Sequence, residues 1–369
     1  MALNCGIVGL PNVGKSTIFS ALSSAKAEAA NYPFCTIEPN VGIVPVPDPR
    51  LERLVELFQP KKRVPAVVEF VDIAGLVAGA SKGEGLGNQF LAHIREVGII
   101  AHVVRCFDDP DVVHVANRVD PISDIDVILT ELALADLETV DKRLEKASRS
   151  MKVLGGEQKR AAEHEFAALT KVRAALEQGK PARSVALSDE EAVEARQWFL
   201  LTMKPQIYVC NVDESGVKGD NAHVKAVRER AAAEGAEAVV ICGKFEAELA
   251  DLGSDEEKRE FLSELGLEES GLTALVHAAY RLLGLRTFLT AGPDECRAWT
   301  IRAGDKAPQA AGVIHTDFEK GFIKAEVYSF ADIDALGSEK AVKEAGKLRV
   351  EGKEYVVQDG DVVFFKFNV

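Results

Sequence analysis

The sequence lacks the features of several protein classes. Its 369 residues contain no run of 18 apolar residues that could cross a membrane, and its six cysteines never form a CxxC pair. Basic residues are the minority, 44 against 58 acidic ones, and the net charge of −14 excludes a generally basic, DNA-coating surface. Residues 1–10 lack a basic stretch followed by a long apolar run. We therefore expect a cytoplasmic protein with reduced thiols, no membrane or DNA partner, and only local contacts with nucleic acid.

What the composition does contain is typical of a folded chain with two or three domains. Hydrophobic residues make up 47% of the chain and charged residues 28%. Four short apolar runs predict buried strands: Cys5–Leu10, Val67–Val71, Ile99–Cys106 and Ile207–Cys210. Helical patterns separate these runs, which predicts an α/β domain with a mostly parallel sheet. Its ligand should lie in the loops at the carboxyl ends of the strands.

Residues 125–201 have a different, helical pattern. Apolar residues alternate at spacings of three and four, first at Leu137, Val140, Leu144, Ala147, Met151 and Leu154, and then at Ala162, Phe166, Leu169, Val172 and Leu176. Gly155 and Gly156 separate the two stretches, which predicts an antiparallel helical hairpin inserted in the first domain. Helices of some 25 residues would form an arm of roughly 40 Å. The alternative is a helical lobe that lies flat on the domain.

The C-terminal residues have a third pattern. Gly, Pro and Asp residues separate four segments with strand character: Arg286–Gly292, Cys296–Gly304, Phe322–Phe330 and Asp361–Phe367. Residues Ala307–His315 are expected to form a helix between them. We therefore expect one domain over residues 1–283, which includes the 125–201 insertion, and a compact α+β domain over residues 284–369.

A phosphate-binding motif lies near the start of the chain. Residues Gly9–Thr17, GLPNVGKST, match the pattern GxxxxGK[ST] after a predicted strand and at the start of a predicted helix. Such a loop curls its backbone amides around phosphate oxygens. Lys15 would bridge the β- and γ-phosphates, and the Ser16 hydroxyl would bind Mg²⁺. In a further hypothesis, the side-chain carbonyl of Asn12 binds K⁺, which would act as a fixed positive charge beside the phosphates. The alternative for the whole motif is a glycine-rich turn that binds no ligand.

Two downstream segments supply further expected contacts. Asp72 follows the strand that ends at Val71, and its carboxylate can hold Mg²⁺ through water while Gly75 offers its amide to the γ-phosphate. The glycine-rich segment 75–90 is expected to order around that phosphate. Between the two motifs, Thr36 is the expected second hydroxyl ligand for Mg²⁺, the alternative being a surface turn.

The nucleotide base should be read after the strand Ile207–Cys210. Residues 211–214, Asn-Val-Asp-Glu, stand where guanine-binding proteins carry [NT]KxD, and they depart from that pattern twice. The carboxylate of Glu214 is one methylene longer than that of Asp, and Val212 offers only a short apolar face in place of a lysine stem. Guanine's N1–H and 2-amino donors would then lack a well-placed acceptor, whereas adenine has neither donor. We therefore expect adenine to be preferred, with Asn211, Val212 and Glu214 at the base, and assign no role to Ile241–Phe245.

The group that orients the attacking water is less evident. Leu76 occupies the position of the water-orienting glutamine of Ras-like enzymes, and leucine cannot orient water. Two histidines fall near the expected nucleotide edge, His114 and His93. We take His114 as the candidate, against the alternative that it is a solvated or structural side chain.

The chain resembles the YchF type of Obg-like ATPase, of the translation-factor-related P-loop GTPase class, in five segments: GLPNVGKST, NYPFCTIEPN, VDIAGLVAGASKGEGLGNQFL, NVDE and IHTDFEKGFIKAEV. The resemblance covers essentially the whole chain. It implies a P-loop domain, an α-helical coiled-coil arm and a C-terminal TGS domain of the β-grasp type. It also implies slow Mg²⁺-dependent hydrolysis of ATP in preference to GTP, and association with the ribosome, mainly its large subunit.

The same resemblance assigns site residues. Phosphate contacts fall on Asn12, Val13, Gly14, Lys15, Ser16 and Thr17, with Mg²⁺ ligands at Ser16 and Thr36 and a base contact at Val212. Because the chain is acidic, ribosomal RNA would have to meet local basic patches. The candidates are Lys142, Arg143, Lys146 and Arg149 on the arm, and Arg286, Arg297, Arg302, Lys306, Lys320 and Lys324 in the C-terminal domain. The alternative for the arm is an ordinary solvated helix face.

Two other functions remain open at this stage. The protein could be a non-catalytic ATP sensor or scaffold, in which the nucleotide only orders a loop, and Leu76 is compatible with that hypothesis. It could also be a GTPase, which Glu214 disfavours without excluding.

Overall fold

The computed structural model describes residues 3–24, 40–73, 86–109 and 118–368. The predicted Thr36, Gly75 and His114 lie outside these residues, as does Leu76. Contacts between residues divide the chain into two compact units, the first with residues 1–42 and 69–279 and the second with residues 43–68 and 280–369. Among the described residues, no helix is both long and apolar enough to cross a membrane.

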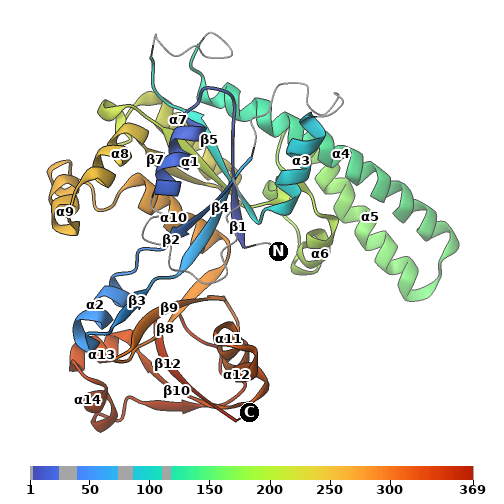
Figure 1. Ribbon diagram of the computed structural model, residues 1–369. Helices are drawn as coiled ribbons and strands as arrows, with labels where there is room; N and C mark the ends of the chain where they lie inside the picture. The colour runs from blue at the N-terminus through green and yellow to red at the C-terminus, as the bar shows by residue number, and fades with distance from the viewer. Residues whose placement is uncertain (1–2, 25–39, 74–85, 110–117, 369) are drawn as a thin grey trace. The chain divides into compact units, whose positions relative to one another are not determined.

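The first unit is built on a mostly parallel sheet. The described strands follow the order β2-β4-β1-β5-β6-β7 (Figure 1). Their bounds are β1 Asn4–Gly9, β2 Val41–Pro45, β4 Val67–Asp72, β5 Ile99–Arg105, β6 Gln206–Asn211 and β7 Glu237–Ile241. Parallel pairing joins β4, β1, β5, β6 and β7 in turn. Every residue of β5 and β6 is buried, which is why these strands have continuous apolar sequences, and the predicted α/β class is confirmed.

Helices pack on this sheet and connect its strands. They are α1 Lys15–Ser24, α3 Leu86–Glu96, α7 Ala222–Glu234, α8 Gly243–Asp251, α9 Asp255–Glu264 and α10 Gly271–Leu282. Val224 and Val227 of α7 share a core with Val104 of β5 and Tyr208 of β6. The side chain of Asn221 caps α7 by accepting the amide of Val224 at 2.8 Å. This packing fixes the strand ends from which the candidate site is built.

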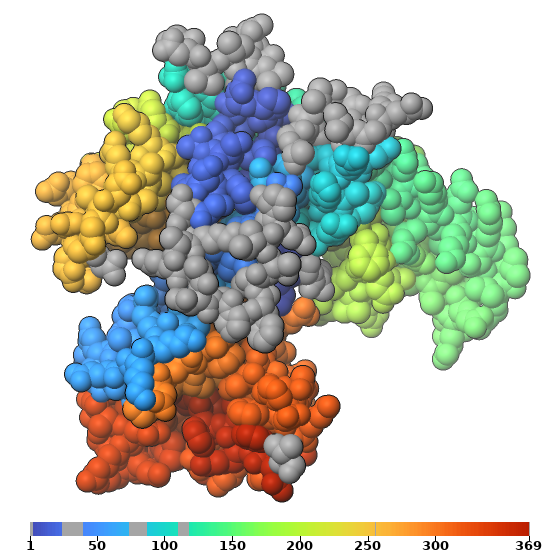
Figure 2. Space-filling model, viewed as in Figure 1, coloured from blue at the N-terminus to red at the C-terminus, as the bar shows by residue number. Residues whose placement is uncertain are grey.

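The inserted residues form the predicted helical hairpin. Helices α4 Pro121–Val153 and α5 Gly156–Glu177 are followed by α6 Asp189–Ala195 and by 3₁₀ turns at Ala182–Ser184, Arg196–Trp198 and Leu201–Met203. Val140 of α4 and Leu169 and Val172 of α5 are fully buried in the seam. Figures 1 and 2 show the hairpin extending away from the sheet, and α4 alone, at about 1.5 Å per residue, is roughly 50 Å long. The arm therefore projects, as expected.

The second unit contains a mixed sheet with a helix on one face. Its described strands have the order β11-β10-β12-β8-β9-β3. The C-terminal elements are β8 Leu285–Thr290, β9 Glu295–Arg302, α11 Ala307–Ile314, α12 Thr316–Lys320, β10 Phe322–Ser329, α13 Phe330–Leu336, α14 Glu339–Glu344, β11 Arg349–Glu351 and β12 Asp361–Phe367. The last strand lies between β8, to which it is parallel, and β10, to which it is antiparallel. A hairpin, a crossing helix and a central last strand form the β-grasp arrangement, and the predicted helix at Ala307 is confirmed.

A segment from the first quarter of the chain completes this second unit. Helix α2 Pro49–Phe58 and strand β3 Lys62–Val64 belong to it, and β3 extends the sheet by pairing in parallel with β9. Leu51 and Leu54 of α2 are fully buried. The expected domain over residues 1–283 is therefore interrupted, because the apolar face of residues 43–68 is buried in the C-terminal unit. The second unit resumes at Tyr280.

Candidate nucleotide-binding site

The P-loop is a tight turn at the carboxyl end of β1. Two of its residues have left-handed backbone conformations, Asn12 with φ of 63° and Gly14 with φ of 91°. A Cβ atom at Gly14 would lie only 2.0 Å from Nδ2 of Asn211, so this position has room for glycine alone. The same Nδ2 donates to the carbonyl oxygen of Val13 at 2.9 Å. The predicted base-site residue Asn211 thus fastens the P-loop to the end of β6.

Lys15 and Asp72 come together at the centre of the site. The Lys15 ammonium donates to the Asp72 carboxylate, and their side chains are only 12% and 24% exposed. Asp72 is placed there because β4 pairs in register with β1, with Asp72 opposite Ile7. The predicted phosphate-binding cation and the predicted metal-binding carboxylate are therefore direct neighbours, although they are 57 positions apart in the sequence.

The side chains expected to bind the metal have suitable chemistry. Ser16 and Thr17 are exposed in the first turn of α1, beside Lys15. Among the described residues, no three His, Cys, Asp or Glu side chains gather as a metal cluster. Mg²⁺ is commonly held by one or two protein oxygens together with water and substrate phosphates, so one hydroxyl and one carboxylate are sufficient. Ser16 and Asp72 therefore fit this ion, which would neutralise phosphate charge when bound.

The loop after β6 differs in its details from what the sequence suggested. Val212 is only 3% exposed, so little of its surface is available to a base. Asp213 caps the following 3₁₀ turn, Glu214–Gly216, by accepting the amide of Gly216 at 2.9 Å. Glu214 is exposed and forms an ion pair with Lys244 in the first turn of α8. Asp213 is also exposed, but its Oδ1 accepts from Ser215 and Gly216 within the turn. Glu214 is therefore the carboxylate of this loop that points to the neighbouring strand end, and a ligand can reach it.

Sequence reasoning missed the contribution of residues 243 and 244. A Cβ atom at Gly243 would lie 2.9 Å from Cγ2 of Thr17, so the start of α8 packs directly on the helix that follows the P-loop. The available signal was the position of these residues after a strand, β7, that ends at the same edge of the sheet. Their role depends on tertiary packing, and no local motif announces it. The other histidine candidate, His93, is exposed on α3.

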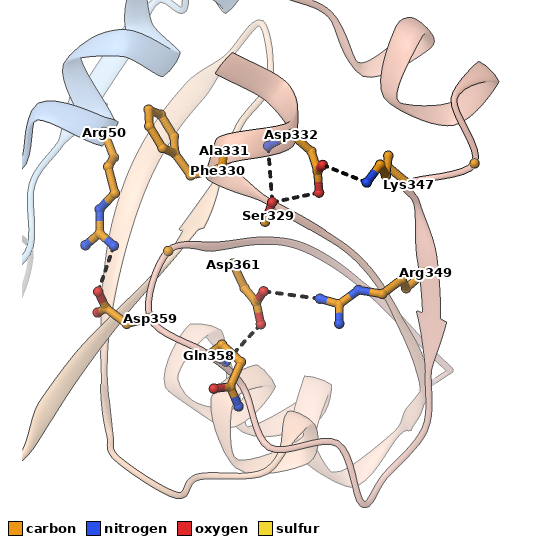
Figure 3. Close-up of a pocket in the computed structure, with 12 residues that line it drawn as sticks. Arg50, Ser329, Phe330, Ala331, Asp332, Lys347, Arg349, Gln358, Asp359 and Asp361 are labelled. Atoms are coloured by element: carbon orange, nitrogen blue, oxygen red, sulfur yellow. Dashed lines mark hydrogen bonds and ion pairs between the residues drawn. The ribbon is translucent and has the colours of Figure 1, made fainter. Parts of the chain in front are cut away.

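A separate cavity of about 640 Å³ lies within the second unit (Figure 3). Charged side chains line it, and they pair with one another. Asp359 accepts from Arg50 at 2.7 Å and from the amide of Thr287 at 2.8 Å, and Asp332 lies 3.6 Å from Lys347. The Arg50–Asp359 pair joins α2 to the C-terminal part of the unit. Because these lining carboxylates are already engaged, we assign no ligand to this cavity.

Comparison with known proteins agrees with this geometry. Residues 4–150 match a family described as 50S ribosome-binding GTPase, and residues 285–368 match the YchF GTPase C-terminal family, described as a protein of unknown function. The solved structure of the Schizosaccharomyces pombe YchF GTPase superposes with a TM-score of 0.88 at 41% identity, covering 99% of this chain and 97% of that one.

Full-length relatives support the same assignment. The chain is 56% identical to the ribosome-binding ATPase YchF of Bacillus subtilis and 54% identical to that of Escherichia coli O157:H7, with both chains of each pair covered completely. It is 46% identical to Obg-like ATPase 1 of Rattus norvegicus over the whole of this chain and 93% of the relative. The protein therefore belongs to the YchF family of ribosome-binding ATPases.

Proposed function

We propose that this protein is a slow, Mg²⁺-dependent ATPase that acts as a nucleotide switch on the ribosome, mainly on its large subunit, in the cytoplasm. The observation that carries the proposal is the Lys15–Asp72 pair next to the P-loop. The conformation of this loop requires glycine at position 14. This pair joins the two charges that phosphoryl transfer needs, one for phosphate oxygens and one for a metal. The names of the full-length relatives support ATP and the ribosome as ligands.

Each residue of the site has a part in this proposal. Lys15 compensates phosphate charge, the amides of residues 12–17 hold the phosphates, and Ser16 and Asp72 hold Mg²⁺, with Thr36 as a further ligand. Asn211 fastens the P-loop to the end of β6, and Glu214 lies on the base side together with the backbone of the largely buried Val212. Gly75 and His114 keep their proposed contacts with the γ-phosphate and the attacking water, and Asn12 its proposed contact with K⁺.

Phosphate release tests the enzymatic part of the proposal. We expect release from ATP that requires Mg²⁺, exceeds release from GTP, and falls by roughly 100-fold or more in Lys15→Ala, because transition-state charge loses its partner. Lys61→Ala is the matched control, because Lys61 is 82% exposed and pairs on the surface of the second unit with Asp294. Release without loss in Lys15→Ala would show that the site is misplaced.

The alternatives give different results in the same assay. A non-catalytic sensor requires no release above background either with or without ribosomes. A GTPase requires GTP to be cleaved as well as or better than ATP. Co-sedimentation with separated ribosomal subunits tests the proposed preference, because equal binding to both subunits would contradict it.

The proposed RNA contacts are local. Lys142 and Arg149 of the arm are about four-fifths exposed and pair with glutamates one turn away on the same helix, at 3.9 and 3.1 Å. Arg143 instead joins α4 to Glu165 and to the carbonyl of Gln197, which is a structural role. In the C-terminal unit Arg297 stacks on Trp299, 3.9 Å from the ring centroid. Lys146 is exposed on the same helix. Lys142, Lys146 and Arg149 are therefore the arm residues best placed to meet phosphates.

A further inference from the structure

An ion pair bridges the two loops that border the expected base site. Glu214 lies in the turn after β6, and Lys244 lies in the first turn of α8, after β7. The Lys244 ammonium donates to Oε1 of Glu214, and the hydrogen bond to this carboxylate raises the pKa of Lys244. The Glu214 side chain is 57% exposed and the Lys244 side chain 72%, so both are accessible to a ligand.

Both loops are fastened to the P-loop. Asn211, three residues before Glu214, donates to the carbonyl of Val13 at 2.9 Å. Gly243, directly before Lys244, packs so closely on Thr17 that a Cβ atom there would lie 2.9 Å from it. A nucleotide whose phosphates occupy the P-loop would therefore extend its base toward the edge formed by these two loops.

The chemistry of the pair discriminates between the two purines. Guanine presents N1–H and a 2-amino group, and both need a strong acceptor such as a free carboxylate. A carboxylate that already accepts from an ammonium is a neutralised and weaker acceptor for a further donor. Adenine presents no such pair of donors and loses nothing when the carboxylate is engaged.

We propose that Lys244 determines the nucleotide preference of this protein by holding and neutralising Glu214, the carboxylate that stands where guanine-binding proteins carry the Asp that reads the base. This inference rests on the proposed ATP-binding function. The preference for ATP would then depend on the Glu214–Lys244 ion pair as well as on the length of the Glu214 side chain. The pair is one of this chain's own side-chain contacts, and it can be removed without touching the phosphate site.

The test is a titration of ATP and GTP binding to the full chain and its variants. Lys244→Met keeps the apolar stem and removes the charge, and we expect the GTP-to-ATP ratio of dissociation constants to fall about threefold to tenfold. Lys244→Arg keeps the ion pair and should keep the wild-type ratio. Adding Lys244→Met to Glu214→Gln should change the ratio little, because no carboxylate remains to be released.

The outcomes separate this inference from the function on which it rests. Wild-type protein that binds GTP as tightly as ATP, or binds neither, overturns the proposed function. Wild-type protein that prefers ATP, with an unchanged ratio in Lys244→Met, overturns the inference alone. An equal loss of affinity for both nucleotides would assign Lys244 to stacking and would also overturn it. Since both side chains are exposed, thermal melting should confirm that all variants fold.

Discussion

Charged side chains gather in two regions of this protein, and the two regions hold them differently. At the nucleotide edge, Lys15 at the start of α1 pairs with Asp72 at the end of β4. Lys244 at the start of α8 pairs with Glu214 in the turn after β6. In the second unit, by contrast, the Asp361 carboxylate accepts from the Tyr355 hydroxyl at 2.6 Å and from the amide of Gln358 at 2.9 Å, and Arg349 lies 3.4 Å away. Asp361 is only 3% exposed.

This difference shows which charges serve stability and which serve a ligand. A buried carboxylate with several donors is costly to disturb, because any lost partner leaves a desolvated charge. The Lys15–Asp72 pair can instead exchange partners, because a bound phosphate and Mg²⁺ would replace the charge that each side chain gives up. The charged side chains that line the cavity in the second unit pair within the fold. The proposed nucleotide site instead uses the pairs at the edge of the first unit.

The largest effect is expected from Asp361→Ala, which should lower the stability of the second unit. Loss of this carboxylate leaves the Tyr355 hydroxyl and the Gln358 amide without their acceptor, at a cost of about 2–4 kcal/mol in the stability of the second unit. Hydrogen exchange resolved by peptide should show faster exchange in β10, β11 and β12. Binding of ATP to the first unit should be unchanged.

A surface variant provides the control for this experiment. Asp334 is 47% exposed and pairs with Arg53 at 2.8 Å, so Asp334→Ala should change stability by less than about 1 kcal/mol. Equal effects of the two variants, or a loss of ATP binding in Asp361→Ala alone, would contradict the division of roles between the two regions.

A second, smaller effect is expected at the P-loop from Gly14→Ala. The added Cβ would strain a backbone with φ of 91° and displace Asn211 from the Val13 carbonyl, costing about 2 kcal/mol and lowering ATP affinity more than tenfold. Isothermal titration calorimetry and thermal melting measure the two effects.

Gly235 is the matched control for this substitution. It has φ of 65° at the end of α7, but an added Cβ would meet no atom within 4 Å. Gly235→Ala should therefore show only the conformational cost, about 1 kcal/mol, with normal ATP affinity. If Gly14→Ala also left ATP affinity normal, the hydrogen bond between Asn211 and the Val13 carbonyl would have no role in nucleotide binding.

The parts of this protein that were predictable from sequence depend on local patterns. The P-loop follows from Gly9 to Thr17 alone, the parallel strands from unbroken apolar runs, and the hairpin from spacings of three and four. Asp72 was predictable because a carboxylate after a strand must lie at the same edge as the P-loop. In each case the information is contained within about twenty consecutive residues or in a rule of topology.

The remaining features depend on contacts between distant residues. Strand β3 has only three residues, of which Val64 alone is buried, and it joins the sheet through β9, more than 230 residues later. Neither the pattern of residues 62–64 nor their neighbours indicates that pairing. The Glu214–Lys244 pair and the burial of Val212 likewise follow from how the ends of β6 and β7 pack, so sequence reasoning named Glu214 and Val212 and missed Lys244.

The smallest expected effect concerns the arm, where exposed charges cost little to change. Lys142→Glu combined with Lys146→Glu should weaken ribosome binding about threefold to tenfold at low salt, and the salt dependence should become less steep as phosphate contacts are lost. ATP hydrolysis without ribosomes should remain at the wild-type rate, since neither residue belongs to the nucleotide site. Co-sedimentation across a salt series measures both the affinity and its slope.

Lys340 allows the role of the arm to be separated from a general effect of charge. It is 85% exposed and pairs with Glu344 one turn away at 3.8 Å, much as Lys142 is 80% exposed and pairs with Glu138 at 3.9 Å. The two lysines thus have the same local setting in different units, and Lys340→Glu should leave ribosome binding unchanged. Since long-range repulsion is screened within about 10 Å at 0.1 M salt, a loss confined to the arm variant must come from contacts made there. Binding that is flat with salt and indifferent to all of these changes would mean that protein surfaces, and not RNA phosphates, meet this chain.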